Sequence, residues 1–130
     1  MTGVSEEGSA AAPGYECCTF RGSLTALDAE TGEVIWKCSM PDIGNKGKNE
    51  AGYSSIIISE AAGVRQYIQL TNKGLIGLAT EDGRFLWGYN KIANSVANIP
   101  TPIVLGNYVF CSTAYGTGSA LLELIPAGDG

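Results

Sequence analysis

The chain has 130 residues, of which 45% are hydrophobic and 16% are charged, and its formal net charge is −5. This composition suits a protein with a packed core, and the negative charge gives no electrostatic support for nucleic-acid binding. The sequence contains no histidine, which excludes Ser-His-Asp and Cys-His catalysis as well as histidine-ligated zinc or haem.

The N-terminal region is predicted to form three strands with a long insertion after the first. The strands cover about residues 1–5, then 23–28 and 33–38, and the insertion runs from Glu6 to about Gly22. Cys17 and Cys18 are adjacent within it. Neighbouring Cα atoms lie about 3.8 Å apart, whereas disulfides span roughly 4.4–6.8 Å. The pair therefore forms either a strained ring, two buried thiols, or bonds to other cysteines.

Two segments of the chain repeat one another. The segments "ALDAETGEVIWK" (26–37) and "GLATEDGRFLWG" (77–88) align without gaps and match Leu27 with Leu78, Gly32 with Gly83, and Trp36 with Trp87. Each copy is typical of two strands around a tight turn, because the glycine can supply the positive φ that such a turn needs.

Further strands follow in chain order at 54–59, 64–71, 75–79, 84–89, 101–105, 107–113 and 119–125, and Gly106-Asn107 marks a two-residue hairpin. Four short antiparallel strands per repeat are the signature of a propeller blade. We therefore predict an all-β fold, a partial β-propeller of about two and a half four-stranded antiparallel blades, with blade remnants at 1–38, 54–89 and 101–130. Because propellers usually close with four or more blades, we expect a piece of a longer protein. The alternative is a self-contained β-sandwich.

The motif A-L-D-A-E-T-G-E-V-I-W and its second copy resemble the repeat of the pyrroloquinoline-quinone (PQQ) propellers. That family includes PQQ-dependent alcohol dehydrogenases and non-catalytic relatives such as the outer-membrane assembly propeller. The resemblance implies that Trp36 and Trp87 dock between neighbouring blades, and that Ala26 and Gly77 leave room for the indole rings.

A narrower resemblance concerns the N-terminal segment. Gly3-Val4-Ser5 followed by Glu6-Glu7, and Arg21-Gly22 followed by A-L-D, are similar to a segment of the PQQ alcohol dehydrogenases in which a glutamate binds calcium beside the quinone. "CCTFRG" looks most like polyvinyl-alcohol dehydrogenase members. The carboxylates follow Ser5 by one and two positions, whereas the family places its glutamate three positions on.

The resemblance implies a metal role for Glu6 and Glu7, which could offer carboxylate oxygens to calcium. It implies cofactor contacts for Ser5, Cys17, Cys18 and Arg21, where the guanidinium would pair with a quinone carboxylate. The alternatives are a solvated acidic loop and a surface arginine. Cys38 and Cys111, on predicted strands, are expected to be small core residues.

The four strands of each blade are lettered A to D from the propeller axis outward. Because strands alternate in direction, the B–C and D–A loops share one face, and the resemblance implies that the cofactor binds there. The D–A loops, residues 39–53 and 90–100, contain Asn45, Asn49, Asn90, Asn94 and Asn98. These asparagines offer polar contacts, although turn formation is the stronger reading.

Two functions remain open from the sequence. The first is a PQQ- and calcium-dependent quinoprotein that oxidises a small-molecule or polymeric alcohol, with a cytochrome as a candidate electron acceptor and a periplasmic or secreted location. No catalytic base can be assigned. The second is a non-catalytic PQQ-like propeller that acts as a binding or scaffold protein of the cell envelope.

Overall fold

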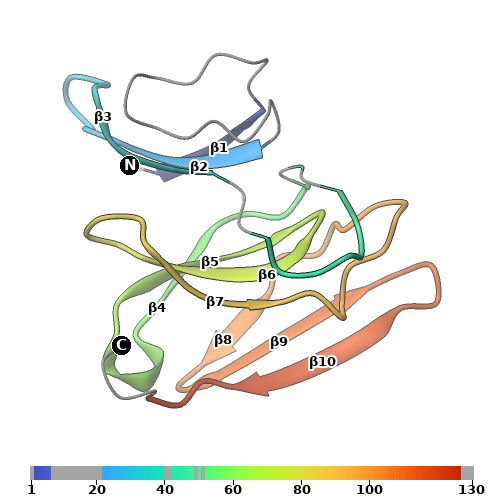
Figure 1. The fold of residues 1–130 in the computed structure, drawn as a ribbon. Coiled ribbons are helices and arrows are strands. Elements are labelled where there is room, and N and C mark those ends of the chain that lie inside the picture. The colour runs from blue at the N-terminus through green and yellow to red at the C-terminus, as the bar shows by residue number, and fades with distance from the viewer. Residues whose placement is uncertain (1, 7–21, 40–41, 49, 51, 127–130) are drawn as a thin grey trace.

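The computed structural model describes residues 2–6, 22–39, 42–48, 50 and 52–126, with the backbone alone for residues 2–6, 22–23 and 39. These residues form three antiparallel sheets in which strands adjacent in the chain are paired. Figure 1 shows the sheets stacked as three layers, with sheet two between the others. The predicted all-β fold, a partial β-propeller, is confirmed by these sheets, which contain three, four and three strands in the described part of the chain.

Sheet one contains β1 (Thr2–Glu6), β2 (Gly22–Leu27) and β3 (Val34–Ser39). Sheet two contains β4 (Ile57–Ser59), β5 (Gln66–Thr71), β6 (Gly74–Ala79) and β7 (Phe85–Tyr89), with a short 3-10 turn, η1 (Ala61–Gly63), after β4. Sheet three contains β8 (Ile103–Leu105), β9 (Tyr108–Thr113) and β10 (Gly118–Glu123). In the described part of the chain, no helix has the length and hydropathy needed to cross a membrane.

The sequence repeat is also a repeat of strand register. Ala26 pairs with Trp36 in sheet one, and Gly77 pairs with Trp87 in sheet two; in both ladders the register shifts at the next residue. The turn glycines, Gly32 and Gly83, have φ values of 75° and 72°, as the hairpin prediction required. The two copies are therefore the same C–D hairpin, placed once in each of two successive blades.

The first strand of sheet two is shorter than the sequence suggested, because a side chain takes over part of its pairing. The hydroxyl of Ser54 accepts a hydrogen bond from Leu70 N at 3.1 Å and donates to Leu70 O at 3.0 Å. Ser55 N then donates to the hydroxyl of Thr101, at 2.9 Å. The chain stays attached to β5 here, but regular strand pairing begins only at Ile57.

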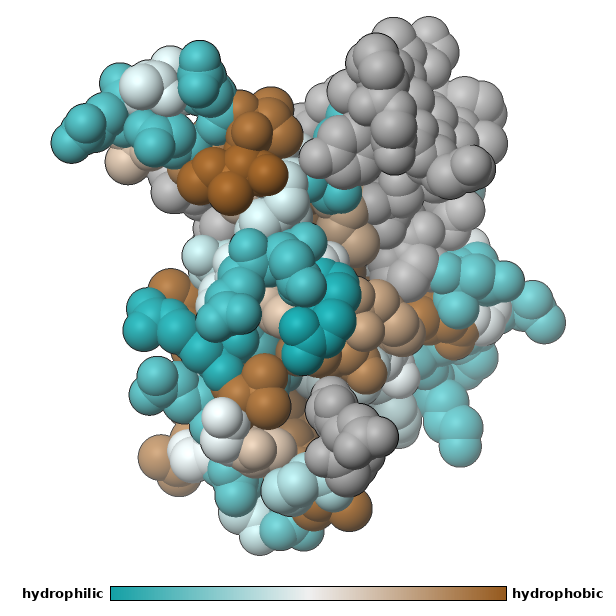
Figure 2. Space-filling view, turned by 60° about the vertical axis from the view of Figure 1, so that its left-hand side comes forward, coloured by the Kyte–Doolittle hydropathy of each residue, from teal (hydrophilic) through white to brown (hydrophobic). Residues whose placement is uncertain are grey.

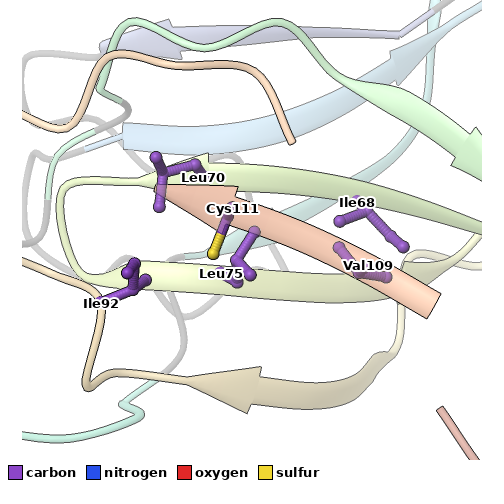
Figure 3. Packing of buried hydrophobic residues seen from close by; sticks show 6 residues of the cluster. All are labelled: Ile68, Leu70, Leu75, Ile92, Val109 and Cys111. Atoms are coloured by element: carbon purple, nitrogen blue, oxygen red, sulfur yellow. The ribbon is translucent and has the colours of Figure 1, made fainter. Parts of the chain in front are cut away.

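Two separate apolar layers lie between the sheets. The layer between sheets one and two contains Leu24, Ala26, Trp36, Ile76 and Leu78. The layer between sheets two and three contains Ile68, Leu70, Leu75, Ile92, Val109 and Cys111, shown in Figure 3. Every residue of β6 is buried, because this strand is covered on both faces. The tryptophans of the two repeats belong to different layers, which is inconsistent with the sandwich alternative.

Trp36 docks between blades, as predicted. Its indole Nε1 donates to Thr80 O in the β6–β7 turn at 3.1 Å, and its ring occupies the space that a side chain at Gly83 would need. Tyr67 of β5 lies beside it, with ring centroids 6.1 Å apart. Sheet one is thereby fixed to the turn of sheet two by an apolar contact and a hydrogen bond.

Candidate functional site

The loop face of the molecule is built around the turn Asn72-Lys73 between β5 and β6. Lys48 N donates to Asn72 O at 3.2 Å, and Asn72 N donates to Glu50 O at 3.0 Å. From the other side, Asn98 Nδ2 donates to Asn72 Oδ1 at 3.3 Å. The B–C loop of sheet two therefore contacts both D–A loops, which confirms that these loops share a face.

Asn90 joins three loops of this face through its side-chain amide. Its Nδ2 donates to Lys73 O at 2.6 Å and to Lys46 O at 3.0 Å, while its Oδ1 accepts from Lys46 N at 3.1 Å. The Nζ of Lys46 also donates to Lys91 O, at 3.3 Å. The side-chain amide of Asn90 thus links its own loop to the loops that contain Lys46 and Lys73, and Lys91 is the next residue in the chain.

Four lysines lie on the loops of this face, together with the carboxylates of Asp42 and Glu50. Lys46, Lys48 and Lys91 are exposed and Lys73 is half-buried. Within the described residues, the recorded salt bridges link Arg65 with Glu60 and Arg84 with Asp82, and neither involves these lysines. An excess of cations on loops that share a face raises the local concentration of anionic ligands. The lysine cluster was missed from the sequence, although applying the loop-alternation argument to lysines would have found it.

Asn94 and Asn98 shape the second D–A loop. Asn98 is fully buried; its Nδ2 donates to Asn94 O at 3.1 Å and its Oδ1 accepts from Asn94 N at 3.0 Å. The Oδ1 of Asn94 in turn accepts from the backbone of Val96 and Ala97. These asparagines form turns, which is the stronger of the two interpretations given above. Asn45 is exposed, and Asn49 lies outside the described residues.

One buried acceptor close to this face has no partner among the described residues. Gln69 on β5 is 1% exposed, and its Nε2 donates to Ser54 O at 3.1 Å. Its Oε1 makes no hydrogen bond in the described part of the structure. Since a buried carbonyl left unpaired costs about 1–3 kcal/mol, Oε1 marks a position where a hydrogen-bond donor would be stabilised.

Two of the residues predicted for the cofactor site lie at the end of β1. Ser5 pairs with Ser23 and Glu6 pairs with Gly22, so the insertion leaves and re-enters the sheet at one point. By the correspondence between β1–β2 and β5–β6, this point is on the loop face. Glu7, Cys17, Cys18 and Arg21 lie outside the described residues, and Arg21 immediately precedes Gly22 in sequence.

The residue types of this segment are of the kind that the implied metal would use. Calcium prefers oxygen ligands and carboxylates in particular, and the side chains of Glu6 and Glu7 are carboxylates. Among the described residues there is no cluster of three or more His, Cys, Asp or Glu. A metal shell that used Glu6 and Glu7 would therefore need further oxygens from the cofactor or from other parts of the chain.

The two cysteines on strands are core residues, as expected. Cys111 is buried between sheets two and three, and burial raises the pKa of its thiol to about 11. Cys38 is half-buried and packs against the layer between sheets one and two. Burial keeps the Cys111 thiol protonated at neutral pH, which makes it a poor nucleophile.

The opposite face carries the A–B and C–D turns and an open groove of about 510 Å³. The groove lies between the A–B turns of sheets two and three, where Asn107 Oδ1 accepts from Ala62 N at 2.9 Å. The exposed pair Glu60–Arg65 lies at its rim, with a 3.9 Å separation. Figure 2 shows the side of the molecule toward these turns, with hydrophobic patches among hydrophilic residues.

Short antiparallel sheets stacked face to face, with the B–C and D–A loops of successive sheets on one side, define a β-propeller architecture. The chain belongs to the PQQ-like repeat family: the family model described as outer membrane protein assembly factor BamB matches residues 18–124. The resemblance of the repeat is thereby confirmed.

Short segments of the chain are similar to two curated enzymes. The polyvinylalcohol dehydrogenase of Sphingopyxis sp. (strain 113P3) is 58% identical over 31 residues, which is 24% of this chain and 5% of that protein. The polyvinylalcohol dehydrogenase of Pseudomonas sp. is 65% identical over 23 residues, which is 18% of this chain and 4% of that protein. The matched segments thus span a small part of either relative. No solved structure matches the chain.

Proposed function

We propose that this chain contributes blades to a PQQ-dependent quinoprotein that oxidises an alcohol, of small-molecule or polymeric kind. The observation that carries the proposal is the pairing of Glu6 with Gly22. It brings the two ends of the carboxylate-, cysteine- and arginine-bearing insertion together on the side where the lysine loops converge. The local identity of 58% to an enzyme named polyvinylalcohol dehydrogenase supports the same function.

The roles follow from side-chain chemistry. Glu6 and Glu7 would hold calcium through carboxylate oxygens, and Arg21 would hold a quinone carboxylate with its planar guanidinium. Ser5, Cys17 and Cys18 would line the cofactor. The positive potential of Lys46, Lys73 and Lys91 would draw the anionic quinone toward this face.

When bound, calcium would supply Lewis-acid chemistry and PQQ would supply a hydride acceptor. The residues of this chain hold and orient the two groups. The carboxylate base that would take the alcohol proton has no candidate among these residues and would lie in other blades. The chain would then be a fragment with blade remnants 1–38, 54–89 and 101–130, in a periplasmic or secreted protein that can pass electrons to a cytochrome.

A calorimetric titration of PQQ into the protein that carries this chain, with calcium in excess, tests the proposal. We expect saturable binding that falls roughly tenfold or more in Glu6→Gln/Glu7→Gln or Arg21→Gln, since each removes a charge-assisted contact. Glu81→Gln, an exposed carboxylate on the opposite face, is the matched control and should bind normally. Absence of quinone binding to the unaltered protein would overturn the proposal.

A second candidate is a non-catalytic PQQ-like propeller that acts as a scaffold of the cell envelope. The description of the matching family model as an outer membrane protein assembly factor favours it, as does the short turn Asn72-Lys73 that sheet two carries in place of the long insertion. The two candidates separate in one assay, the reduction of an artificial electron acceptor by an added alcohol with PQQ and calcium. The quinoprotein shows alcohol-dependent reduction and the scaffold shows none.

A further inference from the structure

Large apolar side chains are exposed on the loop face itself. Four of them lie on the two D–A loops and on the loop between β9 and β10, and they are between 53% and 72% exposed: Tyr53, Val96, Ile99 and Tyr115. We call these four residues the aromatic platform. The β9–β10 loop lies at the right of Figure 1, on the same side as the D–A loops. Apolar side chains that gather on one surface usually mark an interaction site.

One hydrogen-bonded hub joins the loops that carry the platform. Tyr53 N donates to Asn98 O at 3.3 Å, and the side chain of Asn98 bonds both the N–H and the carbonyl of Asn94. Asn94 then accepts from Val96 N at 2.9 Å and donates to Ala114 O, next to the second tyrosine, at 3.5 Å. Because Asn98 is fully buried, the exposed side chains stand on a fixed common base.

Tyr115 has a backbone conformation that its side chain disfavours. Its φ is 59°, in the left-handed region that glycine adopts readily and that strains a residue with a bulky side chain. Gly116 and Gly118 of the same loop also have positive φ, so this loop uses glycine elsewhere for that conformation. Packing does not account for the tyrosine, because its side chain is exposed. Such strain is concentrated at functional sites, and an exposed ring points to contact with a ligand.

The platform occupies the uncharged half of the loop face. Residues 92–122, which supply three of its four side chains, contain no Asp, Glu, Lys or Arg. The lysine half of the face attracts anions, whereas this half suits a neutral ligand. Tyrosine presents an apolar ring and a hydroxyl on a rigid side chain, so it matches a ligand that carries both C–H groups and hydroxyls. Ser95, exposed, and Thr117, half-buried, add further neutral hydroxyls on the same loops.

We propose that the aromatic platform binds a neutral polyhydroxylated chain, with the tyrosine rings against its C–H groups and the loop hydroxyls bonded to its hydroxyls. Only an extended ligand can contact side chains from three loops together, and a polymeric alcohol is extended whereas a small alcohol is not. The inference rests on the proposed function in that the bound chain is its substrate, held on the same face as the cofactor segment. The platform thereby selects the polymeric kind of alcohol over the small-molecule kind.

The test is calorimetric titration of the protein that carries this chain, without PQQ or calcium, with three probes. These are fully hydrolysed polyvinyl alcohol, a neutral glucan oligosaccharide and 2-propanol. We expect saturable binding of polyvinyl alcohol and none of 2-propanol at the same hydroxyl concentration. Because the contacts involve no charge, the affinity should be the same at low and high salt. The glucan distinguishes a sugar chain from an alcohol polymer as the source of the same chemistry.

Two variants remove the rings. Tyr53→Asn and Tyr115→Asn should each weaken binding of the polymer roughly tenfold or more, because tyrosines often carry much of the energy of a contact. Asparagine tolerates positive φ, so Tyr115→Asn should keep the loop conformation and the thermal stability of the protein. Phe85→Asn is the matched control and should bind normally, because Phe85 is also an exposed aromatic residue but begins β7 at the opposite end of sheet two.

The outcomes separate this inference from the proposed function. A protein that binds PQQ but no polymer would overturn the inference alone. A protein that binds the polymer through both tyrosines but no PQQ would support the platform and overturn the quinoprotein. Binding of the glucan alone would overturn the role of the platform in holding the substrate. Equal weakening by Phe85→Asn, or an affinity that falls with salt, would overturn the placement of the site on the uncharged half.

Discussion

The two tryptophan repeats have the same sequence pattern and the same register but end in different contacts. Trp36 is 6% exposed, and its Nε1 donates to Thr80 O in the next sheet. Trp87 is half-buried, and its Nε1 donates to Gln66 Oε1, at 2.6 Å, in its own sheet. The repeat therefore fixes the strand position of each tryptophan, whereas the residues around the ring determine which group its Nε1 donates to.

The difference lies in what each ring finds beside it. The ring of Trp36 rests on the turn at Gly83, whereas the indole of Trp87 lies over Gly77 and its nitrogen reaches the buried amide of Gln66. Trp36 thus makes both its apolar contact and its hydrogen bond between sheets one and two, whereas Trp87 packs against the layer between sheets two and three and makes its hydrogen bond inside sheet two. Variants at matched positions of the two repeats can separate these contributions.

Replacing each tryptophan by alanine should give the largest contrast. Trp36→Ala removes a buried indole and leaves a cavity between sheets one and two, and should lower the free energy of unfolding by about 3–5 kcal/mol. Trp87→Ala removes a half-buried ring and should cost about 2 kcal/mol. Urea unfolding followed by circular dichroism measures both. Equal losses would contradict the assignment of inter-blade cohesion to Trp36.

The turn glycines provide a second matched pair. Both have positive φ, so alanine strains the backbone at either position by about 1–2 kcal/mol. At Gly83 the new Cβ would also overlap the ring of Trp36, but at Gly32 nothing lies within 4 Å. Gly83→Ala should therefore cost about 2–4 kcal/mol, since overpacking is added to the strain, and Gly32→Ala should cost about 1 kcal/mol. Urea unfolding measures both free energies of unfolding. A loss of stability at Gly32 as large as at Gly83 would show that the Trp36 ring moves aside without a measurable energetic penalty.

Much of the fold was predictable because its signals are local. The repeated hairpin was identified from Gly32, Gly83 and the tryptophans, and each strand predicted in chain order is present within a few residues. Alternation of strand direction correctly placed the B–C and D–A loops on one face. These inferences need only period-two patterning and turn chemistry.

The contacts between loops were not predictable in the same way. Asn90 holds Lys46 and Lys73 together although they are far apart in sequence, and Ser54 replaces a strand pair with its hydroxyl. Such hydrogen bonds depend on which loops meet in three dimensions. The sequence around a loop asparagine or serine does not indicate which group its side chain will bond. The roles predicted for Glu6 and Arg21 stay predictions.

Gln66 provides an intermediate test of the contact inside sheet two. Its Nε2 donates to Ala61 O at 3.3 Å and to Val64 O at 3.2 Å, while its Oε1 accepts from Trp87. Gln66→Leu leaves the indole N–H and two carbonyls without this partner and should cost about 1–3 kcal/mol. In a double-mutant cycle the cost should shrink when Trp87 is already phenylalanine. Simple additivity of the two changes would mean that the Gln66–Trp87 bond contributes nothing.

The smallest effect concerns the acidic residues of the two repeat turns. Backbone N–H groups of Thr31 and Glu30 donate to Asp28, at 2.9 and 2.8 Å, and lower the pKa of its carboxyl. In the second turn, the N–H of Arg84 lowers the pKa of Asp82, with help from its guanidinium charge. The folded state lowers both pKa values, so ionisation of these carboxyls stabilises the fold at any pH above the pKa of an aspartate in the unfolded chain, about 3.9. This contribution to the free energy of unfolding is lost as the pH falls through the lower pKa values of the folded state. Asp28→Asn should make the free energy of unfolding less dependent on pH in this acidic range. It should change the value at neutral pH little, since both carboxylates are exposed. Carboxyl carbon chemical shifts against pH measure the two pKa values directly, and midpoints at or above the unfolded value would contradict the turn hydrogen bonds.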